Sequence, residues 1–167
     1  EEEKARLVAE GVAVADDIIT GKVKAGKKSA IIGTGLTALE AAETMLEQGV
    51  EVTIIGRSEK VGRGVFPVIL NDVLSRVNSY KPEYMFNQNT NKITESGVVV
   101  TDKATGEEKL VEADTVVLAI GITPKKYIVE AFEKEFDNVI AVGDALKGGR
   151  IHNATKDGFT KAFAFDD

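Results

Sequence analysis

The sequence predicts an α/β fold: a Rossmann-like, mainly parallel sheet with helices on both faces and an antiparallel β-meander. Three observations predict it. A strand pattern, a glycine turn, a helical pattern and a second strand follow one another within residues 29–55. Alternating and β-branched residues follow at 92–111, and two later apolar runs each end in glycine. A strand–helix–strand unit this short is expected to form a right-handed parallel crossover.

The first elements follow from hydrophobic period and glycine placement. Residues 1–10 form a charged, helix-prone leader, and a helical turn at 16–20 ends at Gly21. A polar connection leads to an apolar run at 29–32, which is typical of a buried parallel strand. Residues 36–48 have helical spacing and stop at Gly49, and residues 50–55 form the next strand.

The later elements change character and then return to apolar strands. We expect a helix at 65–79, a short strand at 84–86 and a meander with a hairpin turn at 102–107. After it we expect, in order, a strand at 114–120, a helix at 127–136, a strand at 139–142 and a helix at 151–165.

Composition excludes several classes of site. The 167 residues contain no cysteine and one histidine, which excludes thiolate metal sites, iron–sulfur clusters and cysteine nucleophiles within this sequence. We therefore predict no metal site and name no catalytic side chain. A net charge of −6 argues against a nucleic-acid groove, and no apolar run approaches the roughly 18 residues of a membrane span. Together with the lack of a signal-peptide pattern, this predicts a cytoplasmic location.

The glycine turn is the first candidate binding motif. Gly33 allows a tight turn off the strand, Gly35 lets a pyrophosphate approach the backbone, and Ala38 permits close helix–strand packing. Free N–H groups and the positive dipole end of the helix favour a phosphate there. The alternative is a tight glycine turn without a ligand. The candidate residues are Gly33, Thr34, Gly35, Leu36, Thr37 and Ala38.

The end of the second strand suggests which dinucleotide binds. A site that prefers NAD usually has an acidic residue there to hold the ribose 2′-hydroxyl. This sequence has Gly56, Arg57 and Ser58, and residues 57–63 carry a local charge of +2. That favours a 2′-phosphate and hence NADP over NAD. The alternative is a solvated basic turn.

Two further strand ends are weaker candidates. Ile120 and Gly121 follow an apolar strand, where a cofactor could lie against the strand end, although a plain core strand also explains the pattern. Asp144 follows the last apolar run and could accept hydroxyls from a ribityl chain, or could simply cap the next turn.

The order of these motifs resembles the pyridine-nucleotide-disulfide-oxidoreductase-like fold. More narrowly, residues 10–165 resemble the C-terminal part of multidomain NADH:flavin oxidoreductases such as 2-enoate reductase and 2,4-dienoyl-CoA reductase. The resemblance implies that the glycine turn holds the NAD(P) pyrophosphate and that Arg57 and Ser58 lie by the adenosine ribose. It also implies that Gly121 lies near the cofactor and that Asp144 contacts the ribityl chain of FAD.

The resemblance also implies a domain organisation. Residues 1–28 would be a leader and connection, 29–125 an NAD(P)-binding domain and 126–167 the C-terminal fragment of an FAD-binding domain. The first half of the FAD domain and a barrel domain with FMN and an iron–sulfur cluster would belong to a longer parent enzyme. The chain would bind the dinucleotide and associate with those domains of the parent enzyme. Alone it would be inactive. Whether it forms a homo-oligomer stays open.

Two other functions remain open. One is a non-catalytic nucleotide-sensing or interaction module with the same fold. The other is a different nucleotide-binding enzyme, such as a methyltransferase, which Gly56 disfavours because an acidic residue would normally hold the ribose at that position. Retention of flavin by the purified protein would favour the redox function over the sensing module.

Overall fold

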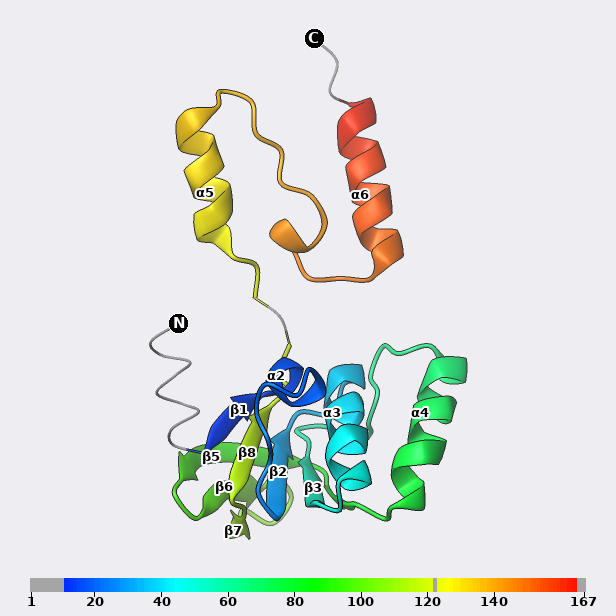
Figure 1. Ribbon diagram of the computed structural model, residues 1–167, viewed down its shortest axis with the longest axis vertical. Helices are drawn as coiled ribbons and strands as arrows, with labels where there is room; N and C mark the ends of the chain where they lie inside the picture. The colour runs from blue at the N-terminus through cyan, green and yellow to red at the C-terminus, as the bar shows by residue number, and fades with distance from the viewer. Residues whose placement is uncertain (1–10, 122, 165–167) are drawn as a thin grey trace. The chain divides into compact units, whose positions relative to one another are not determined.

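The computed structural model describes residues 11–121 and 123–164, and it divides into one unit of residues 1–120 and another of residues 121–167. The leader predicted at residues 1–10 lies outside the described residues. The first unit contains both sheets of the fold, and Figure 1 labels its helices and most of its strands.

A five-stranded sheet forms the centre of the first unit, and all its paired strands are parallel. This confirms the predicted mainly parallel sheet. Four strands match the sequence prediction, whereas β1 (Val12–Val14) was not anticipated. In spatial order the strands are β1 (Val12–Val14), β8 (Thr115–Leu118), β2 (Lys28–Ile32), β3 (Glu51–Ile55) and β4 (Glu83–Met85).

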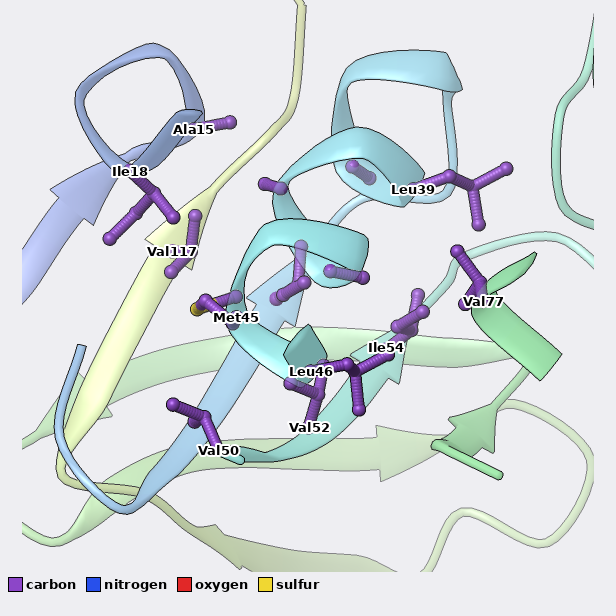
Figure 2. Close-up of a cluster of buried hydrophobic side chains, with 14 of the residues drawn as sticks. Ala15, Ile18, Leu39, Met45, Leu46, Val50, Val52, Ile54, Val77 and Val117 are labelled. Carbon is purple, nitrogen blue, oxygen red and sulfur yellow. The ribbon is translucent and has the colours of Figure 1, made fainter. Parts of the chain in front are cut away.

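Three helices pack on one face of this sheet. They are α2 (Ala15–Ile19), α3 (Leu36–Glu47) and α4 (Pro67–Ser79), and all three contribute to a single apolar cluster. Figure 2 shows α3 lying over the strands, with Leu39 and Met45 of the helix near Ile54 and Val117 of the sheet. Full burial of each such large side chain stabilises the fold by about 1.5–3 kcal/mol.

The meander covers the opposite face. Its strands are β5 (Gln88–Thr94), β6 (Gly97–Asp102) and β7 (Glu108–Glu112), paired antiparallel as predicted. Successive residues of one strand point to opposite faces, so Ile31 joins the helical cluster while Ala30 packs with Val98 and Val100 of β6. The sequence predicted helices on both faces. In the described residues of this unit the second face carries the meander instead, because its valines supply the apolar surface.

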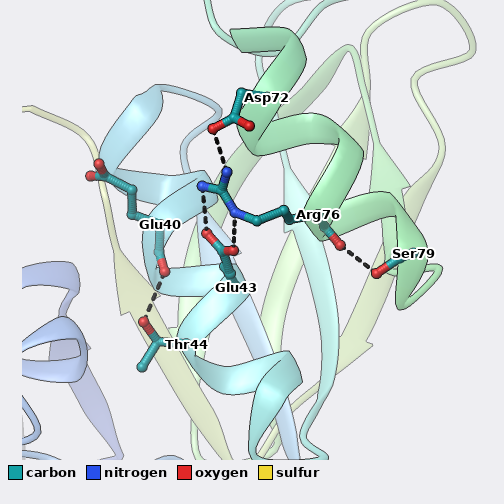
Figure 3. A network of polar contacts seen from close by, with 6 residues as sticks. All are labelled: Glu40, Glu43, Thr44, Asp72, Arg76 and Ser79. Carbon is teal, nitrogen blue, oxygen red and sulfur yellow. Dashed lines mark hydrogen bonds and ion pairs between the residues drawn. The ribbon is translucent and has the colours of Figure 1, made fainter. Parts of the chain in front are cut away.

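A charged network joins α3 to α4. Arg76 of α4 donates hydrogen bonds to Glu43 of α3, with one Nη2–Oε2 distance of 3.2 Å, and to Asp72 on its own helix (Figure 3). These bonds raise the pKa of the Arg76 guanidinium above its ordinary value. The network, together with buried Val73 and Val77, fixes the position of α4 against α3, the helix that begins at the glycine turn.

The second unit contains the helices α5 (Lys126–Glu135) and α6 (Ile151–Phe163) and a 3-10 turn, η1 (Gly143–Ala145). Both helices were predicted, although the expected end at residue 165 lies outside the described residues. The strand predicted at 139–142 is wrong: those residues are irregular. A strand needs a neighbour for its backbone hydrogen bonds, and the described residues of this unit provide no other strand. No helix among residues 11–121 and 123–164 is long and apolar enough to cross a membrane.

Candidate dinucleotide-binding site

The strand order creates a ligand-binding position at one edge of the parallel sheet. From β2 the chain crosses through α3 to β3, its neighbour on one side. It reaches β8, the neighbour on the other side, through the meander on the opposite face. Adjacent strands whose connections leave to opposite faces form a topological switch point, and open α/β sheets bind ligands outside the carboxyl ends of such strands. The glycine turn directly follows the carboxyl end of β2.

Gly33 brings the ends of β2 and β8 together. Its φ of 130° lies in a region that side chains rarely adopt, and an added Cβ would lie 2.2 Å from the carbonyl oxygen of Ala119. Its N–H donates to the carbonyl of Ile55 at 2.9 Å, so the turn also contacts the end of β3. The tight turn predicted from the sequence is therefore present, and its glycine is required by a backbone contact.

Gly35 has the opposite environment. It is the N-cap residue of α3 with φ −76° and ψ −177°, a conformation open to any residue. An added Cβ would meet no heavy atom of the described chain within 4 Å. No side chain caps the helix there and its first turn carries no acidic residue. Backbone N–H groups and the positive helix end thus adjoin free space, which suits a pyrophosphate.

The other turn residues divide between this opening and the core. Thr37 is exposed on the first turn of α3, and Leu36 is half-buried. Ala38 is fully buried in the helical cluster, consistent with the close helix–strand packing expected of it. A larger residue at position 38 would push the helix away from the sheet, and with it the N–H groups that face the opening.

The second motif lies directly against the first. An added Cβ at Gly56 would lie 2.5 Å from the γ-methyl carbon (Cγ2) of Thr34. The N–H of Gly62, in the loop that follows β3, donates to the Thr34 carbonyl at 2.6 Å. The structure therefore brings the glycine turn and the basic loop together, as expected of two motifs that would bind one dinucleotide.

The basic loop surrounds a surface hollow of ≈ 570 Å³ lined by residues 58–63 and Asn87. Arg57 is exposed beside it, and Ser58 donates its hydroxyl to the carbonyl of Lys60 at 3.1 Å. The loop carries Arg57, Lys60 and Arg63 against the single acid Glu59. This charge balance favours an anionic group in the hollow.

Sequence analysis missed a further cation, Lys103. This residue belongs to the turn between β6 and β7, and its Nζ donates to the carbonyl of Arg57 at 2.6 Å. Its backbone N–H donates to the carbonyl of Asn87 at 2.9 Å, which anchors the hairpin turn beside the hollow. The sequence predicts the turn itself, but only the packing of the meander on the sheet brings it to the basic loop.

Asp102 holds that turn in place. Its Oδ1 accepts the N–H groups of Thr105 at 3.0 Å and Ala104 at 2.8 Å, and its Oδ2 accepts from Gln88 at 2.9 Å. These hydrogen bonds, led by the one from Thr105, lower the pKa of the Asp102 carboxyl below its ordinary value of 3.8. The ionised form is thus the one that the folded turn prefers.

We expect the stability of the meander to fall in acid because of Asp102. A lowered folded-state pKa adds stability above the unfolded pKa, and that stability is lost as the pH falls through the folded value. Unfolding followed by urea titration between about pH 2 and 6 should show this loss. Asp102→Asn should be less stable at neutral pH and less sensitive to acid. The exposed Glu95→Gln, in the other turn of the meander, is the control and should keep the wild-type profile.

The remaining candidates lie near or beyond the boundary between the two units. Ile120 ends the first unit, 71% exposed, directly after Ala119. Gly121 begins the second unit with φ 112° and with open space around a Cβ position among the described residues. Asp144, also in the second unit, accepts the N–H of Gly149 at 3.0 Å. Asp144 thus contacts the loop between η1 and α6 without being the N-cap residue of either, and its contact with FAD stays a prediction.

The parallel sheet, its switch point, the open glycine turn and the basic loop together define a dinucleotide-binding α/β domain. Residues 2–158 match the family of pyridine nucleotide-disulphide oxidoreductases, and the chain belongs to that family. The resemblance predicted from the order of motifs is confirmed.

Relatives of this chain are larger reductases and oxidases. It is 28% identical over 150 residues to an NADH oxidase of Thermoanaerobacter brockii and 29% identical over 142 residues to a cinnamate reductase of Clostridium sporogenes. These matches cover 88% and 83% of this chain but only 23% and 21% of the relatives. A solved structure of 2-naphthoyl-CoA reductase matches with a TM-score of 0.80 at 27% identity, over 92% of this chain and 23% of that one.

The matches establish the general class of the domain. It is a pyridine nucleotide-disulphide oxidoreductase domain of the kind found in flavin-dependent reductases, and NAD(P) and FAD are the cofactors of that class. The chain spans about a quarter of the length of the relatives above. The activity and substrates of a whole enzyme are therefore matters for proposal.

Proposed function

We propose that this chain binds NAD(P)H at the Gly33–Ala38 turn and presents the nicotinamide to FAD within a larger flavoprotein. The observation that carries the proposal is the opening at Gly35, where a bare helix N-terminus faces free space at the switch point of the sheet. A pyrophosphate placed there would accept N–H groups at the start of α3.

The residues of the chain would bind and orient the dinucleotide. The bound cofactors supply the hydride transfer between nicotinamide and flavin, so no acid or base is needed from a side chain. Arg57 and Ser58 would lie by the adenosine ribose. Ile120 and Gly121, just beyond the end of β8, would lie near the bound cofactor. Asp144 would contact the ribityl chain of FAD.

The domain organisation is part of the same proposal. Residues 29–125 would form the NAD(P)-binding domain, and residues 126–167 would be the closing part of an FAD domain. Supporting this division, α5 and α6 bury no side chain among the described residues, although both carry large apolar residues. The remaining FAD and barrel domains of a parent enzyme would complete the flavin site. The chain alone would therefore be inactive as a reductase.

Calorimetric titration of the purified chain with NADPH tests the binding function. Saturable binding of one nucleotide per chain is expected, and a folded chain that binds neither NADPH nor NADH would contradict it. Absorbance after incubation with FAD and desalting gives a second measurement. Retained flavin would favour the redox function over a nucleotide-sensing module.

We expect NADP(H) to bind about tenfold more tightly than NAD(H), equivalent to about 1.4 kcal/mol. The planar guanidinium of Arg57 can donate a pair of hydrogen bonds to a 2′-phosphate, and Lys103 adds a cation whose Nζ lies 2.6 Å from the Arg57 carbonyl. Arg57→Ala should remove most of the preference, and rising salt should weaken it because the loop is exposed.

Dissociation constants of both nucleotides at two salt concentrations provide the test. Lys27→Ala is the matched control, since it removes the same charge at the opposite, amino end of β2. It should leave the ratio unchanged. Tighter binding of NAD, or an Arg57→Ala variant with the wild-type ratio, would show that the basic loop is only a solvated turn.

A further inference from the structure

We propose that Thr34 determines the nucleotide preference of this site by filling the space that an acidic residue at position 56 would need. The inference rests on the proposed function, because it concerns the choice between two dinucleotides at the same turn. It assigns to Thr34 the role of a positioning residue that acts through its neighbour, with no contact to the 2′-phosphate required.

The geometry at Gly56 singles out one obstacle. A Cβ built at this position would lie 2.5 Å from Thr34 Cγ2, a separation that forces a shift, and 3.5 Å from its next nearest neighbours, Phe86 Cδ1 and the Ser58 carbonyl oxygen. Those two contacts are ordinary van der Waals distances. The backbone of Gly56 does not have a positive φ, so its conformation does not itself demand glycine. The γ-methyl of Thr34 is thus what excludes a side chain.

Thr34 cannot easily move away from a side chain at position 56. Its carbonyl accepts the N–H of Gly62 at 2.6 Å, and it stands between Gly33 and Gly35 in the turn that would hold the pyrophosphate. A β-branched side chain also has restricted χ1 rotation. An acidic residue at position 56 would therefore either strain the Thr34 rotamer or displace the phosphate-binding turn. Displacement of the turn would weaken the binding of NAD and NADP alike.

The preference for NADP over NAD would therefore depend on two residues that are distant in the sequence, Thr34 and Gly56. Thr34 keeps position 56 free of a carboxylate, so nothing there would fix a ribose 2′-hydroxyl or repel a 2′-phosphate. The neighbouring cations, Arg57 and Lys103, are then left to act on the phosphate. A reversal of the preference toward NAD should require Thr34 and Gly56 to change together.

The experiment compares Gly56→Glu alone with the same substitution in two Thr34 backgrounds. Thr34→Ala removes both γ atoms, whereas Thr34→Val keeps the branched shape and loses only the hydroxyl. Calorimetry with NAD and NADP gives the two dissociation constants for each protein. Gly56→Glu alone should weaken the affinity for both nucleotides by about tenfold or more. Thr34→Ala/Gly56→Glu should recover binding, with the preference shifted toward NAD by about a hundredfold. Thr34→Val/Gly56→Glu should not recover.

Melting temperatures give a measurement that needs no nucleotide. Gly56→Ala should lower the melting temperature, and the loss should be smaller when Thr34 is already alanine. The inference is overturned if Gly56→Glu alone reverses the preference with full affinity, if Thr34→Val rescues as well as Thr34→Ala, or if the melting effects simply add. Wild-type protein that binds neither nucleotide, while the melting effects remain coupled, would instead refute the proposed function and leave the steric exclusion at position 56 demonstrated.

Discussion

Replacing Gly33 by alanine is expected to lower the free energy of unfolding of the first unit by about 2–6 kcal/mol. Two independent costs combine. The φ of 130° is strained for any residue with a side chain, and the new Cβ would lie 2.2 Å from the carbonyl oxygen and 2.8 Å from the carbonyl carbon of Ala119. These are backbone atoms at the end of a central strand, so they cannot rotate away as a side chain would. Relief requires β2 and β8 to move apart.

Urea denaturation followed by circular dichroism measures this effect. Gly49→Ala is the matched control, because Gly49 also has a positive φ, of 79°, but an added Cβ there would meet no heavy atom of the described chain within 4 Å. The control should show only the conformational cost, about 1–2 kcal/mol. Equal destabilisation of the two variants would mean that β2 and β8 approach one another less closely than described.

The first unit could largely be predicted because its signals are local and reinforce one another. An apolar run, a glycine turn and a helical pattern each predict one element, and together they predict a parallel crossover. The carboxyl ends of parallel strands meet at the same edge of the sheet. The sequence therefore indicates that Gly35 and Arg57 lie at the same edge of the sheet.

What sequence analysis missed depends on packing between distant segments. Lys103 reaches the basic loop only because β6 lies across the sheet, with Val98 and Val100 against Ala30. The position of Lys103 in the sequence does not predict its contact with Arg57. The steric exclusion between Thr34 and Gly56 is likewise invisible in the sequence, where the glycine suggests only a missing acid.

The wrong strand at 139–142 has a different cause. Its four apolar residues, which end in a glycine, have the composition of a buried strand, and composition was the only signal available. A β-strand is stabilised by a neighbour, and the described residues of the second unit offer none. The same residues could pair in a longer protein, which accords with the proposal that this unit is part of an FAD domain.

Replacing Gly35 by valine is expected to abolish most dinucleotide binding while leaving the fold intact. The residue is exposed and extended, and a Cβ there meets nothing of the described chain within 4 Å, so the change should cost about 1 kcal/mol of stability or less through weaker helix capping. The new side chain would fill the space beside the N–H groups of α3 that a pyrophosphate would occupy. We expect affinity for NADPH and NADH to fall together by about a hundredfold, equivalent to about 2.7 kcal/mol, because the pyrophosphate is common to both.

Calorimetry on Gly35→Val, with Gly35→Ala as a smaller step in the same direction, should show a graded loss of affinity for both nucleotides. Urea denaturation of the same proteins separates this loss from unfolding, and it should place both variants close to the wild type and far from Gly33→Ala. Two glycines in one turn would then have opposite roles: the first required by a backbone contact within the protein, the second by a ligand outside it. A folded Gly35→Val variant that binds NADPH as tightly as the wild type would place the pyrophosphate away from this turn, because the new side chain would occupy the open space beside the start of α3 where the pyrophosphate is proposed to lie.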